Sequence, residues 1–208
     1  MTNLAEFRRH FTVCPLIAIL RGISPDEAEA IGEALVEAGI RIIEVPLNSP
    51  RPFASIAKLR VHLGDRALVG AGTVLDHRHL SRVAEAGGQI VVSPNVDPAV
   101  IRATVEAGLV SAPGYFTPTE AFAALANGAH ALKLFPAEAA GPAVVKAQRA
   151  VLPGDALVIV VGGVTCEVMP SYLEAGASGF GLGSGVYRPG DDAMWVRRRA
   201  EAYVKALA

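Results

Sequence analysis

A lysine in the middle of a short apolar run is the residue of this sequence best suited to covalent chemistry. Lys133 lies between Leu132 and Leu134 in a stretch typical of a buried strand, whereas the other three lysines lie in segments that we expect to be helices. Burial disfavours the charged form of an amine and lowers its pKa, and a neutral amine can attack a ketone to form a Schiff base. Lys133 is therefore a candidate nucleophile. The alternative is a structural lysine whose ammonium group reaches water at the strand end.

A carboxylate in a second apolar run is the natural partner of this lysine. Glu44 lies between Ile43 and Val45. It could hold an arginine in place, or it could transfer protons, directly or through one water, in each step of imine formation and cleavage. The presence of Lys133 favours the second role. Arg21 could pair with Glu44 or hold a substrate anion by a bidentate contact, and its charge would help to keep Lys133 deprotonated.

Two glycine-rich segments indicate phosphate binding. Gly162-Gly163 follows one apolar run, and Gly183-Ser184 lies at the end of another. Glycine lets the backbone approach phosphate oxygens closely, and barrels of parallel strands bind phosphate with the loops after their seventh and eighth strands. Either segment alone could be only a tight turn. Their occurrence on two successive strands favours the phosphate site.

These residues would be positioned by a repeated unit of strand, turn and helix. Eight such units are predicted, and the phrase Glu-Ala-Gly recurs before several strands, where glycine ends a helix. Capping residues and prolines indicate helix starts at Ser24-Pro25, Asp76, Asp97-Pro98, Thr117-Pro118 and Asp191. The predicted strands cover residues 16–20, 42–47, 67–74, 90–94, 109–113, 131–136, 156–161 and 178–183.

The predicted fold is a closed barrel, because eight parallel strands with crossover helices are best arranged in that way. We expect an α/β (β/α)8 TIM barrel that forms a single domain over residues 1–208, with a short helix at residues 1–13 closing its bottom. An open doubly wound sheet would require a glycine-rich turn after the first strand, and residues 21–24 do not supply one. The active site of such a barrel lies at the carboxyl ends of its strands, where the polar candidates are Arg21, Glu44, Asn48, Thr73, Ser93 and Lys133.

Composition argues against several other classes of protein. The 208 residues are 51% hydrophobic and 19% charged with a net charge of −1, which is typical of a compact globular chain. The only basic run is the triplet at residues 197–199, so nucleic-acid binding is not expected. No apolar run reaches the roughly 18 residues that a membrane span needs, so no such span is expected. The two cysteines offer no disulfide framework, and His77 and His79 lack a third ligand for a metal. We expect a cytoplasmic protein without a signal peptide.

Six segments of the chain resemble a known family, the class I aldolases of 2-keto-3-deoxy-6-phospho sugar acids. The likeness extends in order from about residue 15 to residue 188. Asn48 and Val161 stand where the 6-phosphogluconate branch of this family has an arginine and a threonine, so the sequence is more similar to the 6-phosphogalactonate branch. The segments that carry the resemblance are residues 15–22, 44–50, 70–74, 131–136, 161–164 and 181–184.

The resemblance implies cleavage of 2-dehydro-3-deoxy-6-phosphogalactonate to pyruvate and D-glyceraldehyde 3-phosphate. Lys133 would form the imine with C2 of the substrate, and Glu44 would act as general acid and base. Arg21 and Thr73 would hold the carboxylate and ketone end of the substrate. The family is trimeric, and its reaction requires no cofactor or metal. The substrate-binding residues implied by position are Arg21, Thr73, Pro94, Phe135, Val161, Gly162, Gly163, Gly183 and Ser184.

Three alternative functions remain open at this point. The enzyme could prefer the 6-phosphogluconate epimer or accept both epimers. A phosphosugar isomerase or epimerase on the same barrel would use Glu44 as a base and need no imine. A phosphosugar-binding protein without catalytic activity would need neither Lys133 nor Glu44 for chemistry.

Overall fold

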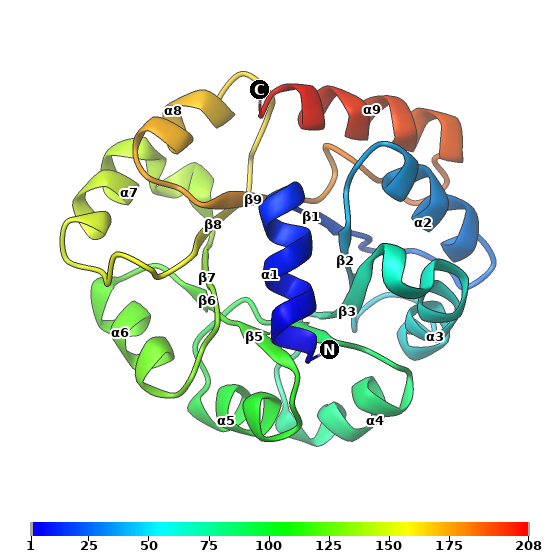
Figure 1. Cartoon of the computed structure of the whole chain (residues 1–208), viewed down its shortest axis with the longest axis horizontal. Coiled ribbons are helices and arrows are strands. Elements are labelled where there is room, and N and C mark those ends of the chain that lie inside the picture. The colour runs from blue at the N-terminus through cyan, green and yellow to red at the C-terminus, as the bar shows by residue number, and fades with distance from the viewer. Residues whose placement is uncertain (1, 208) are drawn as a thin grey trace.

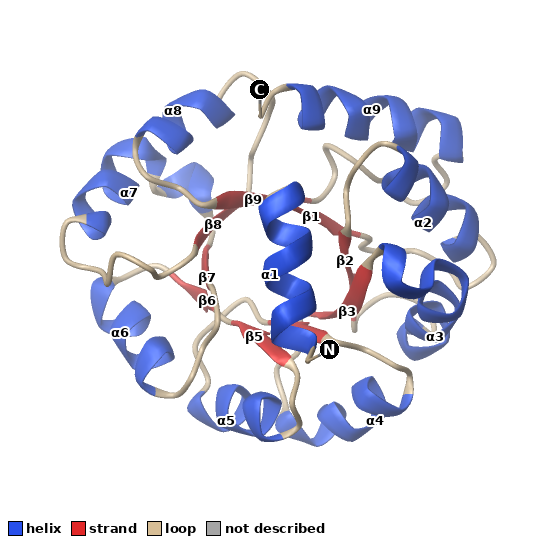
Figure 2. Ribbon diagram, in the orientation of Figure 1, coloured by secondary structure: helices blue, strands red, loops and turns tan. Residues whose placement is uncertain are grey.

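Parallel strands form a closed ring at the centre of the structure, and helices surround it (Figures 1 and 2). This computed structural model describes residues 2–207. β1 pairs with β2 on one side and with β9 on the other, which brings the two ends of the chain's strand series together. The strands are β1 Leu16–Ile19, β2 Ile42–Pro46, β3 Leu68–Gly72, β4 Ile90–Val92, β5 Val110–Ala112, β6 Gly114–Tyr115, β7 Leu132–Leu134, β8 Val158–Val161 and β9 Gly179–Leu182.

The fifth predicted strand, residues 109–113, is observed as β5, and a further short strand, β6, follows beyond its predicted end, so nine strands take the eight predicted places. β5 pairs with β4 and β6 pairs with β7, and only Pro113 separates β5 from β6. Proline has no N–H to donate to a neighbouring strand, which interrupts the ladder at this point. The ring is still closed, because Lys133 N donates to Pro113 O (2.9 Å) and His130 N donates to Ser111 O (2.9 Å). The predicted barrel is therefore confirmed, with this correction.

The strands are apolar on both faces because each lies between the barrel interior and the helices. Along β1, Ile17 and Ile19 face the interior, whereas Leu16 and Ala18 pack against the outer layer. The helices of that layer follow the strands in order around the ring (Figure 2). They are α2 Ala28–Glu37, α3 Pro52–Leu63, α4 Leu80–Glu85, α5 Pro98–Glu106, α6 Pro118–Ala126, α7 Gly141–Arg149, α8 Met169–Glu174 and α9 Ala193–Lys205.

Helix α1 (Asn3–Val13) lies across one opening of the barrel, as predicted for this segment (Figure 1). Phe7 and Phe11 stack with ring centroids 5.3 Å apart and join the apolar cluster of the barrel interior. Asn3 Nδ2 donates to Gly108 O, and Gln89 Nε2 donates to the Glu6 carboxylate. Gly108 and Gln89 precede β5 and β4, so α1 closes the amino ends of the strands and leaves the carboxyl ends for a site.

Two predicted helix starts are confirmed by their caps. The Asp97 carboxylate accepts from Ala99 N at the start of α5. Thr117 forms a capping box with Glu120 at the start of α6, in which each side chain accepts from the other residue's backbone N–H. These two helix starts could be predicted from sequence because each capping bond joins residues that are at most three positions apart.

Two other predicted starts are wrong by a few residues. Ser24 does not cap α2, which begins at Ala28. Instead the Glu27 carboxylate accepts from Ser24 N (2.8 Å), and this bond closes a turn. α9 begins at Ala193 with Asp192 as its cap, because Asp191 is used in other contacts. The predicted start at Asp76 is correct, because its carboxylate accepts from Arg78 N, but the first turn, His77–His79, is a 3-10 helix before α4.

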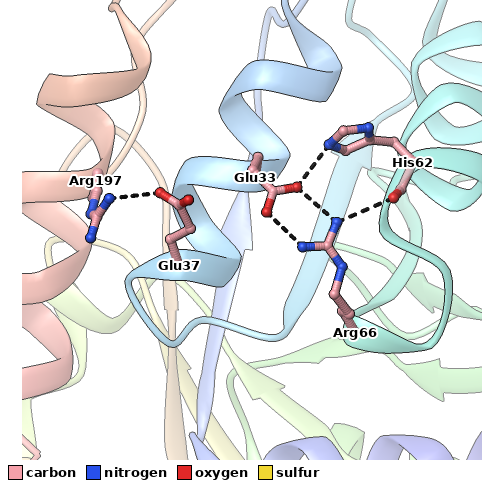
Figure 3. Close-up of polar contacts among 5 residues, drawn as sticks. All are labelled: Glu33, Glu37, His62, Arg66 and Arg197. Atoms are coloured by element: carbon pink, nitrogen blue, oxygen red, sulfur yellow. Dashed lines mark hydrogen bonds and ion pairs between the residues drawn. The ribbon is translucent and has the colours of Figure 1, made fainter.

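Exposed ion pairs join three outer helices (Figure 3). Glu33 of α2 accepts two hydrogen bonds from the Arg66 guanidinium, at 2.6 and 2.7 Å, and lies 2.8 Å from His62 Nε2. Glu37, one turn later, pairs with Arg197 of α9 at 2.7 Å. The Arg66 guanidinium lowers the pKa of Glu33 to about 2. These contacts connect α2 to its two neighbours, far from the carboxyl ends of the strands.

No helix within residues 2–207 has both the length and the apolar character that crossing a bilayer demands.

Candidate active site

Lys133 is buried inside the barrel and is 6% exposed. It is the middle residue of β7, and strand alternation turns it toward the interior while Leu132 and Leu134 pack against the outer helices. Its Nζ lies 4.8 Å from the centroid of the Phe135 ring. The structure therefore does not support the alternative of a lysine that reaches water beyond its strand.

Lys133 and Glu44 line the same small cavity within the barrel. Its volume is about 10 Å³, roughly the space that one water needs. Glu44 is 1% exposed, and its Oε2 has no hydrogen-bond partner among residues 2–207. Gly72 of the neighbouring strand leaves room for this carboxylate, because a side chain at residue 72 would overlap it. The unpaired oxygen and the amine thus share one apolar chamber.

Burial shifts the pKa values of these two groups toward each other. It raises the pKa of Glu44 to about 7, although the charges of Lys133 and Arg21 oppose the change. It lowers the pKa of Lys133, which the charge of Glu44 opposes and that of Arg21 supports. Both shifts favour the neutral forms, so the environment favours an uncharged amine beside a carboxyl group whose pKa of about 7 lets it both give and take a proton.

Arg21 is held beside the cavity mouth by two polar side chains. Its Nη1 donates to Asn48 Oδ1 (2.8 Å) and its Nη2 donates to Thr73 Oγ1 (3.3 Å). Arg21 forms no ion pair with Glu44 among the described residues, although this pair was one of its two predicted roles. Its partner is Asn48 instead. Thr73 has a left-handed backbone with φ of 54°, which costs about 1–3 kcal/mol for a residue other than glycine. Such strain is common at sites where a side chain must be aimed.

A larger cavity of about 720 Å³ opens at the carboxyl ends of the strands. Lys133 lines it from below, so the two cavities meet at this side chain. A volume of this size suits a small organic substrate. All nine predicted substrate-binding residues contribute to its wall: Arg21, Thr73, Pro94, Phe135, Val161, Gly162, Gly163, Gly183 and Ser184.

The loops after β8 and β9 form one side of this cavity. Gly162 and Gly163 have φ values of +109° and +64°, which favour glycine. The Glu138 carboxylate lies against Gly162, so a side chain at residue 162 would also overlap it. After β9, Gly183 O accepts from Val186 N (2.9 Å) in a single tight turn. Two such turns at neighbouring strand ends provide closely approachable backbone for an anion.

Several residues of the site could not be assigned from sequence. Ser93 was expected at the site, but its Oγ donates to Val74 O (2.7 Å) and it does not line either cavity. Tyr187 and Arg188 do line the larger cavity. The sequence could have indicated them only by their position, a few residues beyond the carboxyl end of a predicted strand. Asn48, also expected at the site, lines neither cavity and instead accepts a hydrogen bond from Arg21.

The site offers an amine, a carboxyl group, guanidinium groups and hydroxyls. Within residues 2–207, no three His, Cys, Asp or Glu side chains gather in a way that could hold a metal ion. His77 lies in the 3-10 turn before α4, with Nδ1 3.8 Å from the Asp76 carboxylate. The arrangement is suited to imine and proton-transfer chemistry at Lys133.

Comparison with known proteins agrees with this geometry. Residues 7–196 match the family model described as KDPG and KHG aldolase. A probable 2-dehydro-3-deoxy-6-phosphogalactonate aldolase of Rhizobium meliloti (strain 1021) is 52% identical over 192 residues, which cover 92% of this chain and 91% of that protein. The 2-dehydro-3-deoxy-6-phosphogalactonate aldolase of Escherichia coli (strain K12) is 49% identical over 195 residues, covering 94% and 95%.

A solved structure has the same fold. The structure of native KDPGal superposes with a TM-score of 0.91 at 49% sequence identity, covering 93% of this chain and 94% of that one. The sequence match and the structural match both run through the barrel and the residues that line its cavity. This chain therefore belongs to the KDPG and KHG aldolase family.

Proposed function

We propose that this protein is a class I aldolase that cleaves 2-dehydro-3-deoxy-6-phosphogalactonate to pyruvate and D-glyceraldehyde 3-phosphate. The observation that carries the proposal is the buried Lys133 amine, with a lowered pKa, in one apolar cavity with the Glu44 carboxyl group. Two relatives that share about half of this sequence are named for this reaction. The roles of individual residues in this reaction are inferred from the geometry of the site.

The reaction begins when the neutral Nζ of Lys133 attacks C2 of the keto acid. Glu44 supplies and removes the protons that convert the carbinolamine to an imine and release water. The protonated imine then accepts the electron pair of the C3–C4 bond as that bond breaks, and the C4 hydroxyl proton leaves to Glu44, directly or through one water. The aldehyde departs, the enamine gains a proton at C3, and hydrolysis of the imine frees pyruvate and Lys133.

The cavity has separate surroundings for the two ends of the substrate. Arg21, oriented by Asn48 and Thr73, is available for the carboxylate, and Pro94 and Phe135 line the same region. Gly162, Gly163, Gly183 and Ser184 would bind the phosphate through close backbone approach. Val161 lines the same cavity and stands where the 6-phosphogluconate branch has a threonine, which supports a preference for the galacto epimer.

Borohydride trapping tests the imine. Wild-type protein treated with pyruvate and borohydride should gain the mass of one reduced pyruvate on the peptide that contains Lys133. Lys133→Met should gain none and should lose at least about 10³-fold in kcat, because the covalent route is removed. A wild-type protein that gains no adduct would contradict the proposal and favour an isomerase or epimerase that uses Glu44 as a base.

The epimer preference needs a separate assay. Cleavage of the 6-phosphogalactonate and 6-phosphogluconate substrates can be followed by coupling pyruvate release to lactate dehydrogenase. We expect a higher kcat/KM for the galacto substrate. A strong preference for the gluco substrate would overturn the choice of branch, and the absence of cleavage of either would favour a binding protein. Trimeric assembly, a role in galactonate catabolism, a cytoplasmic location and independence of cofactors stay predictions.

A further inference from the structure

Arg188 lies at the side of the large cavity where the phosphate is expected. It belongs to the loop after β9 and lines the cavity together with Gly162, Gly163 and Ser184. Its Nε donates to Ser184 O (3.1 Å), four residues earlier in the same loop. The guanidinium is thereby held next to the backbone turn that starts the proposed phosphate site.

The backbone of Arg188 is fixed by contacts of its own. Its N–H donates to Asp191 Oδ2 (2.7 Å), and the same carboxylate pairs with Arg199 of α9. The preceding residue, Tyr187, is buried and donates its hydroxyl to Glu27 Oε1 (3.1 Å). The loop is therefore anchored to α9 and to the turn before α2, and Arg188 starts from a defined position.

Pro189 adds a further anchor on the other side of Arg188. Its ring lies against Gly22, where a side chain would overlap it. Gly22 follows Arg21 at the end of β1, and β1 is the neighbour of β9 in the barrel. The Arg188 backbone is thus held between two fixed residues at the cavity rim.

The Arg188 guanidinium forms no ion pair with another residue of the described range 2–207. Asp191, whose pKa is lowered in part by Arg188, forms its ion pair with Arg199 rather than with the Arg188 guanidinium. Arg188 is exposed at the cavity mouth. Its two Nη groups can therefore meet an anion that enters the cavity.

Arg21 and Arg188 are held on opposite sides of β1. Arg21 is bound by Asn48 and Thr73, which follow β2 and β3, whereas Arg188 is bound to the loop after β9. In the barrel β2 and β9 flank β1. The cavity mouth thus presents one guanidinium for each end of a substrate that is anionic at both ends.

We propose that Arg188 is a substrate-binding residue that supplies a side-chain cation to the phosphate end. Backbone N–H groups bind phosphate oxygens without carrying a net charge, and a phosphate ester carries about −1.5 to −2 near neutral pH. A guanidinium adds charge-assisted, bidentate hydrogen bonds and so discriminates phosphorylated from unphosphorylated substrates. This inference rests on the proposed function.

The first test compares Arg188→Gln with wild type on two substrates. For 2-dehydro-3-deoxy-6-phosphogalactonate, kcat/KM should fall about 10- to 100-fold, mainly through a higher KM. For unphosphorylated 2-dehydro-3-deoxygalactonate it should stay within about twofold. Arg188→Lys, which keeps the charge but not the fork of donors, should recover part of the loss. The matched control is Arg198→Gln, since Arg198 stacks on Trp195 of α9 outside the cavity; it should match wild type on both substrates.

A second test needs no catalysis. Calorimetric binding of inorganic phosphate should weaken about tenfold in Arg188→Gln relative to wild type and to Arg198→Gln. Unchanged phosphate binding, or an equal loss of activity on both substrates, would overturn the role of Arg188. Pyruvate trapping at Lys133 should persist in Arg188→Gln. If wild-type protein forms no borohydride-reduced adduct with pyruvate, the aldolase proposal is refuted. The phosphate-binding measurement would still test the role of Arg188 in that case.

Discussion

At the scale of single residues, the chemistry depends on two ionisable side chains in one apolar cavity. Burial lowers the pKa of Lys133 and raises that of Glu44, so each group is shifted toward its neutral form. A neutral amine can attack a carbonyl carbon, and a carboxyl group with a pKa of about 7 can act as acid and as base in one cycle. Burial in the apolar wall is the main cause of both shifts, and the charge of Arg21 adds to the lowering of the Lys133 pKa.

Glu44→Gln should remove proton transfer by this residue while keeping the size and shape of its side chain. The variant should lose about 10²- to 10⁴-fold in kcat/KM. In the wild type, kcat/KM should change around pH 7, and this step should disappear in the variant. A pH profile of kcat/KM from pH 5 to 9 checks this. If the step near pH 7 persists in the variant, another group is responsible.

Glu44→Gln should also change how stability depends on pH. The folded-state pKa of Glu44 is about 7, above the value of about 4.3 for an unfolded chain. Between those values the folded protein holds a proton that the unfolded chain has released, so this residue makes the protein less stable as pH rises. The variant lacks this effect. Its stability relative to wild type should therefore increase from about pH 4 to pH 7 in urea unfolding experiments.

At the scale of elements, the loops at the strand ends decide what the cavity can bind. Gly162 has a left-handed φ of +109° and lies against the Glu138 carboxylate. The left-handed turn does not tolerate a side chain easily, and the Glu138 carboxylate would have to move aside for one. Glu138 reaches Gly162 from the loop after β7, so the predicted phosphate loop depends on its neighbour in the barrel.

Gly162→Ala should therefore disturb phosphate binding more than it disturbs the fold. We expect KM for the phosphorylated substrate to rise about tenfold or more and stability to fall by about 1–3 kcal/mol. Steady-state kinetics and chemical unfolding measure the two effects. Gly154→Ala is the matched control, because nothing lies within 4 Å of the added methyl group and that backbone has no positive φ. Equal behaviour of the two variants would contradict the account of the loop.

At the scale of the whole molecule, the barrel is closed at one end and open at the other. α1 covers the amino ends of the strands, and the large cavity lies at their carboxyl ends (Figure 1). Phe7 is fully buried and belongs to the same apolar cluster as Ile17 and Ile159 of the barrel interior. The bottom helix is thus part of the interior on which the site is built.

Phe7→Ala should lower the free energy of unfolding by about 3–5 kcal/mol, because it leaves a cavity beneath the barrel interior. Urea unfolding measures the loss. Below the melting temperature, pyruvate should still be trapped at Lys133, since the variant leaves the carboxyl ends unchanged. Val13→Ala serves as the control, because Val13 is exposed at the end of the same helix and should cost little. A cost for Phe7→Ala no larger than that of the control would contradict this packing role of Phe7.

Local pattern in the sequence determined the kind of element and the residues with chemistry. Apolar runs separated by capped helices predict the barrel, and they make a lysine and a glutamate within such runs candidates for burial. Asp97 and Thr117 cap their helices through bonds to residues within three positions, so their roles were predictable. Ser24 does not cap α2, because the helix begins four residues later, at Ala28, and has no side-chain cap.

Tertiary structure decided the contacts between segments far apart in the chain. Arg21 turned to Asn48 and Thr73 instead of Glu44, and Arg188 came to the cavity rim through anchors to α9 and to the turn before α2. The break between β5 and β6 at Pro113 depends on the neighbouring strands on both sides. The reason is physical: hydrophobic burial specifies which residues are inside, but the directions of polar side chains depend on which donors and acceptors the closed barrel brings within reach.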